Sequence, residues 1–312
     1  MKHSGKLFAL ACLMLAVYTL LPSAKYSDDD TGRRIKNESE IKEDEVENED
    51  ITPKRGDDSP AKKETADAKT ASAEADLLLC ASQGWYAKHM KNGERPPLPP
   101  EMSYLSEHNG YFLGEDEKKI YLTFDAGYEN GNVAKILDVL KEKNVPGAFF
   151  ILDNLVTSNT DLVKRMIDEG HTVCNHTAKH KDMTKMTTKE EFAAELEKME
   201  NIYREYMGCE IARFYRPPEG KLNEENLVWA DELGYKTVMW SFAYADWDNG
   251  NQPSEDSARE KILSCTHNGE IILLHPTSST NASILGSLID EWRSMGYAFG
   301  RLEELGGGNG NE

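Results

Sequence analysis

Cysteine is scarce in this 312-residue chain, and five cysteines in so long a sequence exclude a small disulfide-held scaffold. The 23 glycines and 12 prolines are too few for a collagen-like or low-complexity chain. Positive charge is also in the minority: 36 Lys and Arg stand against 55 Asp and Glu, for a formal net charge of −19. Because nucleic-acid-binding proteins carry a basic surface, we expect no nucleic-acid partner. The length and the 39% hydrophobic content suffice for one large domain or two small ones.

Residues 1–24 are typical of an export segment. Lys2 and Lys6 precede an apolar run, Leu7–Leu21, which matches the core of a signal peptide and is short for a membrane-spanning helix. The Pro22-Ser23-Ala24 sequence fits the small-residue rule for a cleavage site poorly. A cleaved signal peptide and an N-terminal membrane anchor therefore both stay open. Either one predicts an exported, extracytoplasmic protein of the cell envelope, secreted or associated with the membrane through its N-terminus.

Residues 25–76 are rich in Asp, Glu, Lys, Ser and Thr and hold almost no large apolar side chains. Such a segment cannot bury enough apolar surface to offset its chain entropy, so we expect a disordered charged linker. The glycine-rich residues 306–312 are expected to form a flexible tail. The remaining residues, 77–305, are expected to fold as one domain.

Apolar segments and amphipathic segments alternate after residue 118. We expect strands at Lys119–Phe124, Gly147–Leu152, His171–Cys174, Ala212–Tyr215, Lys236–Trp240, Glu270–Leu274 and Tyr297–Leu302, and helices at Val133–Lys143, Asp161–Asp168, Lys189–Tyr206, Glu224–Leu233, Glu255–Thr266 and Ser283–Met295. This alternation predicts an α/β fold in which helices cover a parallel sheet, either open or closed into a (β/α) barrel. In both architectures the chemistry lies at the carboxyl ends of the strands.

Reactive side chains follow these strands at that end. His176 and His180 are four residues apart, and on a helical turn this spacing would place both imidazoles on one face. Two histidines with a third ligand and open water positions are typical of a catalytic metal site. The alternative is a pair of exposed histidines on a loop. Asn175, directly before the pair, is a candidate for supporting the ligands or for contacting substrate.

The acid–base candidates are Asp125 and His275. Asp125 follows the first strand of the series and suits a general base. The Arg216 guanidinium would pair with the Asp125 carboxylate and keep it ionised. His275 follows a buried strand and suits a general acid, with Asp246 on its other ring nitrogen. The alternatives are a turn-forming Asp and a core histidine. Trp247, next to Asp246, is a candidate wall for an apolar acyl group. The residues alone predict metal-assisted hydrolysis of an amide or ester.

Five short motifs taken together resemble the polysaccharide deacetylase family, also called carbohydrate esterase family 4 or the NodB-homology domain. They are Thr123–Gly127, His176–His180, Arg216–Pro218, Asp246-Trp247 and Leu273–His275. The resemblance covers roughly residues 101–305 and implies a distorted (β/α) barrel. It implies Asp125 as base, Arg216 as the residue that orients it, and His275 as acid tuned by Asp246. It also implies His176 and His180 as ligands of a divalent metal, zinc or another ion, and an oxyanion hole that includes the backbone N–H of Glu219.

One position departs from the family pattern, because Ala126 stands where the family has a second Asp that binds the metal. Metal affinity should then fall, or another group or water must complete the ligand set. The longer string Thr123–Gly131 is similar to a subgroup, the N-acetylmuramic acid deacetylases that begin muramic δ-lactam formation in spore-cortex peptidoglycan. The resemblance therefore implies a peptidoglycan glycan strand as substrate. Deacetylation of peptidoglycan N-acetylglucosamine, chitin oligomers or acetyl-xylan stays open, as does a catalytically dead glycan-binding scaffold.

Overall fold

The computed structural model describes residues 82–306. The expected export segment, the charged linker and the tail beyond its first residue lie outside the described residues. Within that range, no helix combines the length and the apolar character needed to cross a bilayer. The elements are β1 (Gln83–Gly84), η1 (Pro100–His108), β2 (Gly110–Tyr111), β3 (Lys119–Ala126), α2 (Val133–Lys143), β4 (Ala148–Ile151), α3 (Asp153–Ser158), α4 (Thr160–Asp168), β5 (Thr172–Asn175), η2 (Met183–Lys185), α5 (Lys189–Met207), β6 (Ala212–Tyr215), η3 (Pro218–Gly220), β7 (Lys221–Leu222), α6 (Glu224–Glu232), β8 (Lys236–Val238), α7 (Glu255–Cys265), β9 (Glu270–Leu274), α8 (Ser279–Ser294), β10 (Ala298–Phe299) and η4 (Leu302–Glu304).

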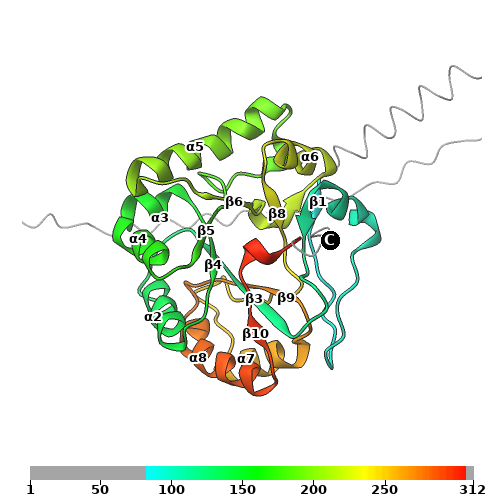
Figure 1. Ribbon diagram of the computed structural model, residues 1–312, viewed down its shortest axis with the longest axis vertical. Coiled ribbons are helices and arrows are strands. Elements are labelled where there is room, and N and C mark those ends of the chain that lie inside the picture. Colours follow the sequence, from blue (N-terminus) through cyan, green and yellow to red (C-terminus); the bar gives the residue numbers. More distant parts are fainter. Residues whose placement is uncertain (1–81, 307–312) are drawn as a thin grey trace, which may run out of the picture. The chain divides into compact units, whose positions relative to one another are not determined.

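One curled parallel sheet carries the fold, and helices surround it (Figure 1). Its strand order is β10-β3-β4-β5-β6-β8-β2, and β9 pairs with β3. The chain just after β8 then meets β9: the Ser241 N–H donates to the Ile271 carbonyl at 2.9 Å, and Phe242 bridges Ile272. The sheet thus bends back toward β3, which confirms the expected α/β fold and its distorted-barrel form.

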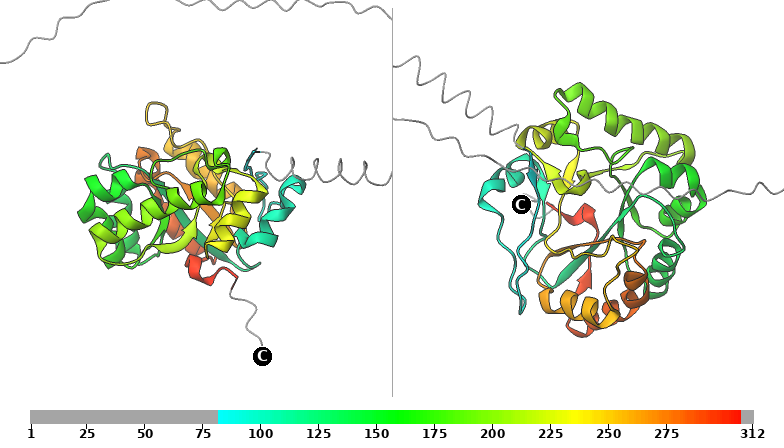
Figure 2. Two further views of the ribbon diagram at one scale, coloured as in Figure 1. Left: turned by 90° about the horizontal axis from the view of Figure 1, so that it is seen from above. Right: turned by 180° about the vertical axis from the view of Figure 1, so that it is seen from behind.

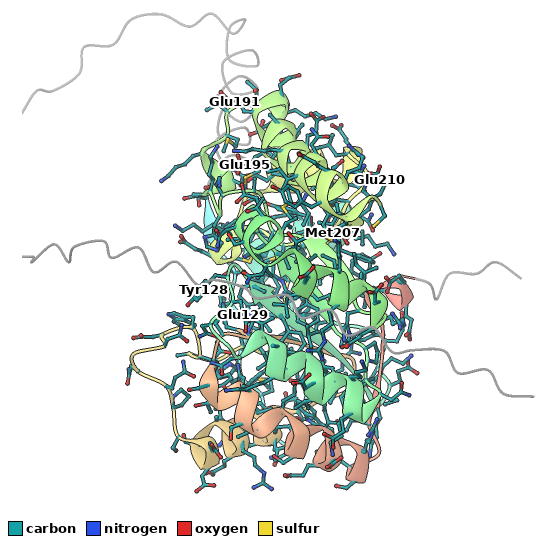
Figure 3. The ribbon with its side chains drawn as sticks, turned by 90° about the vertical axis from the view of Figure 1, so that its left-hand side faces the viewer. Tyr128, Glu129, Glu191, Glu195, Met207 and Glu210 are labelled. Atoms are coloured by element: carbon teal, nitrogen blue, oxygen red, sulfur yellow. The ribbon has the colours of Figure 1, made fainter. Side chains whose placement is uncertain are left out.

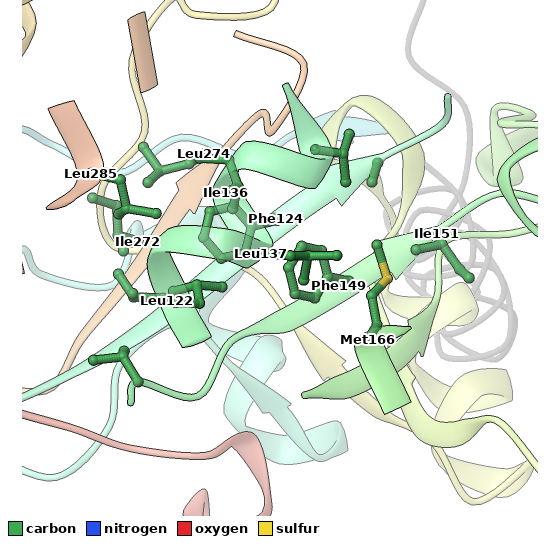
Figure 4. Packing of buried hydrophobic residues seen from close by; sticks show 14 of the residues in the cluster. Leu122, Phe124, Ile136, Leu137, Phe149, Ile151, Met166, Ile272, Leu274 and Leu285 are labelled. Atoms are coloured by element: carbon green, nitrogen blue, oxygen red, sulfur yellow. The ribbon is translucent and has the colours of Figure 1, made fainter. Parts of the chain in front are cut away.

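The alternation of side chains along β3 separates the core from the functional side. Leu122, Phe124 and Ala126 belong to the largest apolar cluster, together with residues of α2 and α8. Figure 4 shows Phe124 beside Ile136 and Leu137 in this layer. Successive residues of a strand point to opposite faces, so Thr123 and Asp125 face the interior of the curled sheet instead. The helices hold the outer face of β3 in place, and this fixes where Asp125 can stand.

Most expected elements occur within one or two residues of their predicted bounds, but the last helix and the final strand differ, and several short elements were not expected. The last helix begins at Ser279 rather than Ser283, because the Ser278 hydroxyl accepts the Asn281 N–H and caps the helix there. The final strand is only Ala298–Phe299; residues 300 and 301 have no regular structure, and a 3₁₀ turn follows at Leu302–Glu304. Helix α3, six residues long, was not expected, since so short a segment carries no periodic signal.

Candidate active site

The carboxylate of Asp125 is held at the end of β3 by a buried guanidinium. Arg216 Nη1 donates to Asp125 Oδ1 at 2.8 Å, and Arg216 is fully buried. Burial by itself raises the pKa of Asp125. The positive charge of Arg216, with smaller contributions from His176 and His275, outweighs burial and holds the pKa below its ordinary value. Asp125 is therefore a carboxylate at neutral pH.

Arg216 itself is fixed by backbone and hydroxyl acceptors. Its Nε donates to the Val238 carbonyl at 2.8 Å, and its Nη2 donates to Thr123 Oγ1 at 2.9 Å and to the Met239 carbonyl at 3.2 Å. Its planar head also lies 4.1 Å from the ring centroid of Phe150. A guanidinium with so many fixed partners has one orientation, and that orientation determines where Oδ1 of Asp125 lies.

His176 and His180 lie close together, but on a loop and not on the helical turn expected from their spacing. The loop follows β5, and two of its residues have left-handed backbone conformations, Thr177 with φ 70° and His180 with φ 54°. The two imidazole centroids are 5.1 Å apart. His180 is exposed, whereas His176 is buried. Non-glycine residues with positive φ are strained and often mark functional loops.

His176 is set up as a neutral imidazole with one free nitrogen. Its Nδ1 lies 2.9 Å from the Arg216 carbonyl, which can only accept, so Nδ1 carries the proton. Its Nε2 lies 3.6 Å from Asp125 Oδ2. Burial lowers the pKa of His176 to about 4, although Asp125 opposes this. The lone pair of Nε2 is therefore available at neutral pH.

The structure corrects one expectation, the substrate contact assigned to Asn175. This side chain is fully buried: its Nδ2 donates to the Tyr235 hydroxyl at 3.0 Å and to the Leu196 carbonyl at 3.2 Å. Its Oδ1 accepts the Thr177 N–H at 2.8 Å. Asn175 thus points away from the pocket and supports the loop of His176 and His180 from behind.

His275 and Asp246 form the second charged pair. The Asp246 carboxylate is fully buried. Its Oδ1 lies 2.7 Å from the ring nitrogen Nδ1 of His275, and its Oδ2 accepts the backbone N–H of His275 at 2.8 Å. Burial lowers the pKa of His275, but the hydrogen bond and charge of Asp246 prevail and raise it above its ordinary value. Nδ1 is occupied, so Nε2 is the nitrogen left for other partners.

A tight turn after Arg216 forms another part of the pocket wall. Glu219 and Gly220 both have left-handed backbone conformations, with φ 57° and φ 65°. A Cβ on Gly220 would lie 2.7 Å from the ring of Trp240, so only glycine fits there. The Glu219 carboxylate is exposed and pairs with Lys221 at 2.7 Å.

These groups surround a single pocket of about 590 Å³. Its lining includes Asp125, His176, His180, Glu219, Trp247 and His275, together with Tyr128, Leu152, Trp240, Tyr244 and Leu273. The wall is thus largely apolar and aromatic, with the charged groups at a few places. Trp247 is 61% exposed, and its ring packs edge-on against His275 at 6.1 Å. It lies on the loop between β8 and α7, which projects from the rest of the domain in Figure 2.

Sequence reasoning missed three residues of this region. Tyr128 lines the pocket and accepts a hydrogen bond from Asn249 at 2.6 Å. Figure 3 shows Tyr128 beside Glu129. The Glu129 carboxylate accepts the backbone N–H groups of Gly131 and Val133 at the start of α2. Tyr244 and Asn281 were also missed. An exposed aromatic and a helical asparagine carry no distinctive pattern, so the sequence offered no signal for them.

The donor set fits a divalent ion through two imidazoles. His176 offers a free Nε2 beside a carboxylate, and His180 lies next to it at the pocket. Within residues 82–306, no group of three or more His, Cys, Asp or Glu side chains is arranged to hold a metal ion. Ala126 supplies no ligand, because its methyl side chain has no donor atom, and it is fully buried in the apolar cluster. The other coordination positions would fall to oxygen atoms of water or substrate.

Comparison with known proteins agrees with this geometry. The profile of the polysaccharide deacetylase family matches residues 114–238. The chain is 36% identical over 235 residues to the peptidoglycan-N-acetylmuramic acid deacetylase PdaA of Bacillus subtilis, covering 75% of this chain and 89% of that protein. The chain belongs to the polysaccharide deacetylase family. Deacetylases of this family are enzymes, carbohydrate esterases that generally depend on a divalent metal.

Solved and curated members of the polysaccharide deacetylase family extend the comparison. The structure of Bacillus subtilis PdaA, a family 4 carbohydrate esterase, has a TM-score of 0.70 and 36% identity, and covers 72% of this chain and 97% of that one. A peptidoglycan-N-acetylglucosamine deacetylase of Bacillus cereus is 31% identical over 225 residues, covering 70% of this chain and 80% of that protein. Relatives named for muramic acid and for glucosamine are thus both similar to this chain.

Proposed function

We propose that this protein removes N-acetyl groups from peptidoglycan, and that its substrate is N-acetylmuramic acid in glycan strands stripped of peptide. This would be the first step toward muramic δ-lactam in spore cortex. The observation that carries the proposal is the presence of two opposed charged pairs, Asp125 with Arg216 and His275 with Asp246, at one pocket. Similarity to PdaA, named as a muramic acid deacetylase, favours this sugar.

In this proposal Asp125 is the general base. Arg216 occupies Oδ1, and the lowered pKa keeps the group ionised, so Oδ2 accepts a proton from water in the pocket. That water forms a bond to the acetamide carbon. The carbonyl oxygen becomes negatively charged, and the backbone N–H of Glu219 donates to it.

His275 is the general acid. Because Asp246 occupies Nδ1 and raises the pKa, the protonated ring can donate from Nε2 to the sugar nitrogen. The C–N bond then breaks, with acetate and a free amine as products. A divalent ion held by His176 and His180, zinc in this proposal, would polarise water and the acetamide carbonyl. Trp247 and the other aromatic residues of the pocket would pack on the acetyl group and the sugar ring.

The cell-wall substrate also agrees with the expected export segment. We propose that the protein acts outside the cytoplasm, either secreted or held at the membrane by residues 1–24. The charged linker, 25–76, would then separate the catalytic domain from the membrane.

The runner-up is deacetylation of peptidoglycan N-acetylglucosamine, which the Bacillus cereus relative favours by its name. Acetate release from peptide-stripped glycan strands, intact peptidoglycan and chitin oligomers, each with and without chelator, separates the two. We expect the fastest release from stripped strands and a loss with chelator that added zinc restores. Faster acetate release from intact peptidoglycan or from chitin oligomers would indicate that the substrate is N-acetylglucosamine and not N-acetylmuramic acid. Glycan binding without any acetate release would instead indicate a scaffold.

A further inference from the structure

Asn281 lies behind the His275–Asp246 pair, in the first turn of α8. Its side chain is buried, with 1% of the residue exposed. Its Nδ2 donates to Asp246 Oδ2 at 2.6 Å and to the His275 carbonyl at 3.1 Å. Its Oδ1 accepts from the hydroxyl of Tyr244, whose residue lines the pocket. One amide thus contacts three separate parts of the site.

The chemistry of these partners allows only one orientation of the amide. A carboxylate and a carbonyl can only accept hydrogen bonds, so the NH₂ group must face Asp246 and His275. The oxygen then faces Tyr244, which has a proton to donate. With both N–H groups and the oxygen engaged, rotation of the amide would break every bond at once.

The position of Asn281 depends on the helix start. Ser278 caps α8 through the Asn281 N–H at 3.1 Å, which places residue 281 in the first helical turn. Asp246 comes from the loop after β8, and His275 comes from the end of β9. Asn281 joins that loop to the end of β9 and to α8 at the acid pair itself, whereas the Ser278 contact to Gln252 and the Thr280 contact to the Pro253 carbonyl join the loop to α8 farther along.

We infer that Asn281 is a positioning residue for general-acid catalysis: it orients the Asp246 carboxylate toward His275 and connects this pair to the pocket wall through Tyr244. The inference rests on the proposed acid role of His275. In the absence of Asn281, the donors to the Asp246 carboxylate within residues 82–306 come from His275 alone, and the carboxylate can turn away from Nδ1. The ring would then lose both its fixed tautomer and its direction.

The test compares single and double variants by acetate release from peptide-stripped glycan and from chitin oligomers. Asn281→Leu keeps the side chain branched at Cγ and removes every side-chain hydrogen bond, so kcat should fall about 10- to 100-fold while KM changes little. In an Asp246→Asn background the same change should lower kcat less than about threefold further, because the carboxylate it orients is gone. If the double variant loses kcat by the product of the two single fold-losses, the substitutions act independently and the inference is overturned.

Asn132→Ala is the matched control. The Asn132 amide donates to the Thr277 carbonyl at 3.0 Å, in the same segment after β9, and is buried, yet it does not contact Asp246. A merely structural role for Asn281 predicts similar kcat losses in both variants, each multiplying with Asp246→Asn. The positioning role predicts that, in an Asp246→Asn background, Asn281→Leu lowers kcat little further, whereas Asn132→Ala lowers it by the same factor as in the native protein.

Tyr244→Phe covers the case in which Asn281→Leu fails to fold, since it removes one hydroxyl. Tyr244→Phe should lower kcat severalfold in the native protein but little further in an Asp246→Asn background. If the two fold-losses in kcat multiply in the double variant, the inference is overturned. Failure of the proposed function has a different signature. Full activity in both Asp246→Asn and His275→Ala would remove the acid role and this inference with it. Large kcat losses in these two variants, beside an unimpaired Asn281→Leu, would refute the inference alone.

Discussion

Replacing Arg216 by Met would test the charged pair at the end of β3. The change leaves the Asp125 carboxylate without its guanidinium, at a position where only 11% of that side chain is exposed. Breaking one partner of a buried ion pair destabilises a protein by about 3 to 5 kcal/mol, because the other charge stays buried and uncompensated. For a domain of this size, each kcal/mol lowers Tm by ~2–4 °C, so we expect Tm to fall by roughly 6 to 20 °C.

The same variant should change the pH dependence. In the native protein the pKa of Asp125 lies below its ordinary value, so its stabilising contribution is present above the unfolded pKa and is lost as the pH falls through the folded pKa. Without Arg216, burial dominates and raises the pKa of Asp125. Since only the ionised carboxylate acts as base, the acidic limb of kcat/KM should move to higher pH.

Urea unfolding and a pH–rate profile measure both effects. Arg204→Met is the matched control: it breaks an exposed contact to Glu210 on the surface, which solvent screens, and should leave the stability nearly unchanged. Asp125→Asn combined with Arg216→Met should recover part of the lost stability, since the end of β3 then holds no buried charge without a partner. A loss below 1 kcal/mol in Arg216→Met, or an acidic limb that does not move, would refute the reasoning.

Three further predictions concern the pocket. Asp125→Asn should abolish acetate release while circular dichroism and metal content stay normal; near-normal turnover would exclude it as base. His176→Ala should lower bound divalent metal, measured by elemental analysis, and added zinc should restore little activity; unchanged metal content would contradict the ligand role. Asp246→Asn should lower the pKa of His275, because the raising hydrogen bond and charge are removed, and the alkaline limb of kcat should shift to lower pH. An alkaline limb at its native position would show that His275 does not set it.

The expected elements came close to the structure where burial repeats regularly. Val133, Ile136, Leu137 and Leu140 are all fully buried on α2, as their spacing predicts. Agreement was poorer where tertiary contacts decide the element. The early start of α8 depends on the Ser278 cap, and the short helix α3 depends on packing. Neither a cap nor packing produces a periodic pattern in the sequence.

The same division holds for the site. Asp125, His176 and His275 were identifiable because each follows an expected strand, and parallel strands bring their carboxyl ends to one edge. Asn175 also follows its expected strand, but in the structure it ends β5 and its side chain is buried behind the loop. Strand position specifies the edge of the sheet, whereas the direction of a side chain depends on the backbone after the strand, here with left-handed φ at Thr177 and His180.

The order of apolar and polar residues along this chain was enough to specify an α/β barrel-like sheet and the end at which its reactive groups collect. That is so because periodicity and strand direction are local properties that each segment carries by itself. Only the folded structure decided which partners those groups meet: a guanidinium on Asp125, a carboxylate on His275, and behind it the amide of Asn281. Such pairings join residues 29 to 91 positions apart in the chain, and only packing of the helices against the sheet brings them within hydrogen-bonding distance.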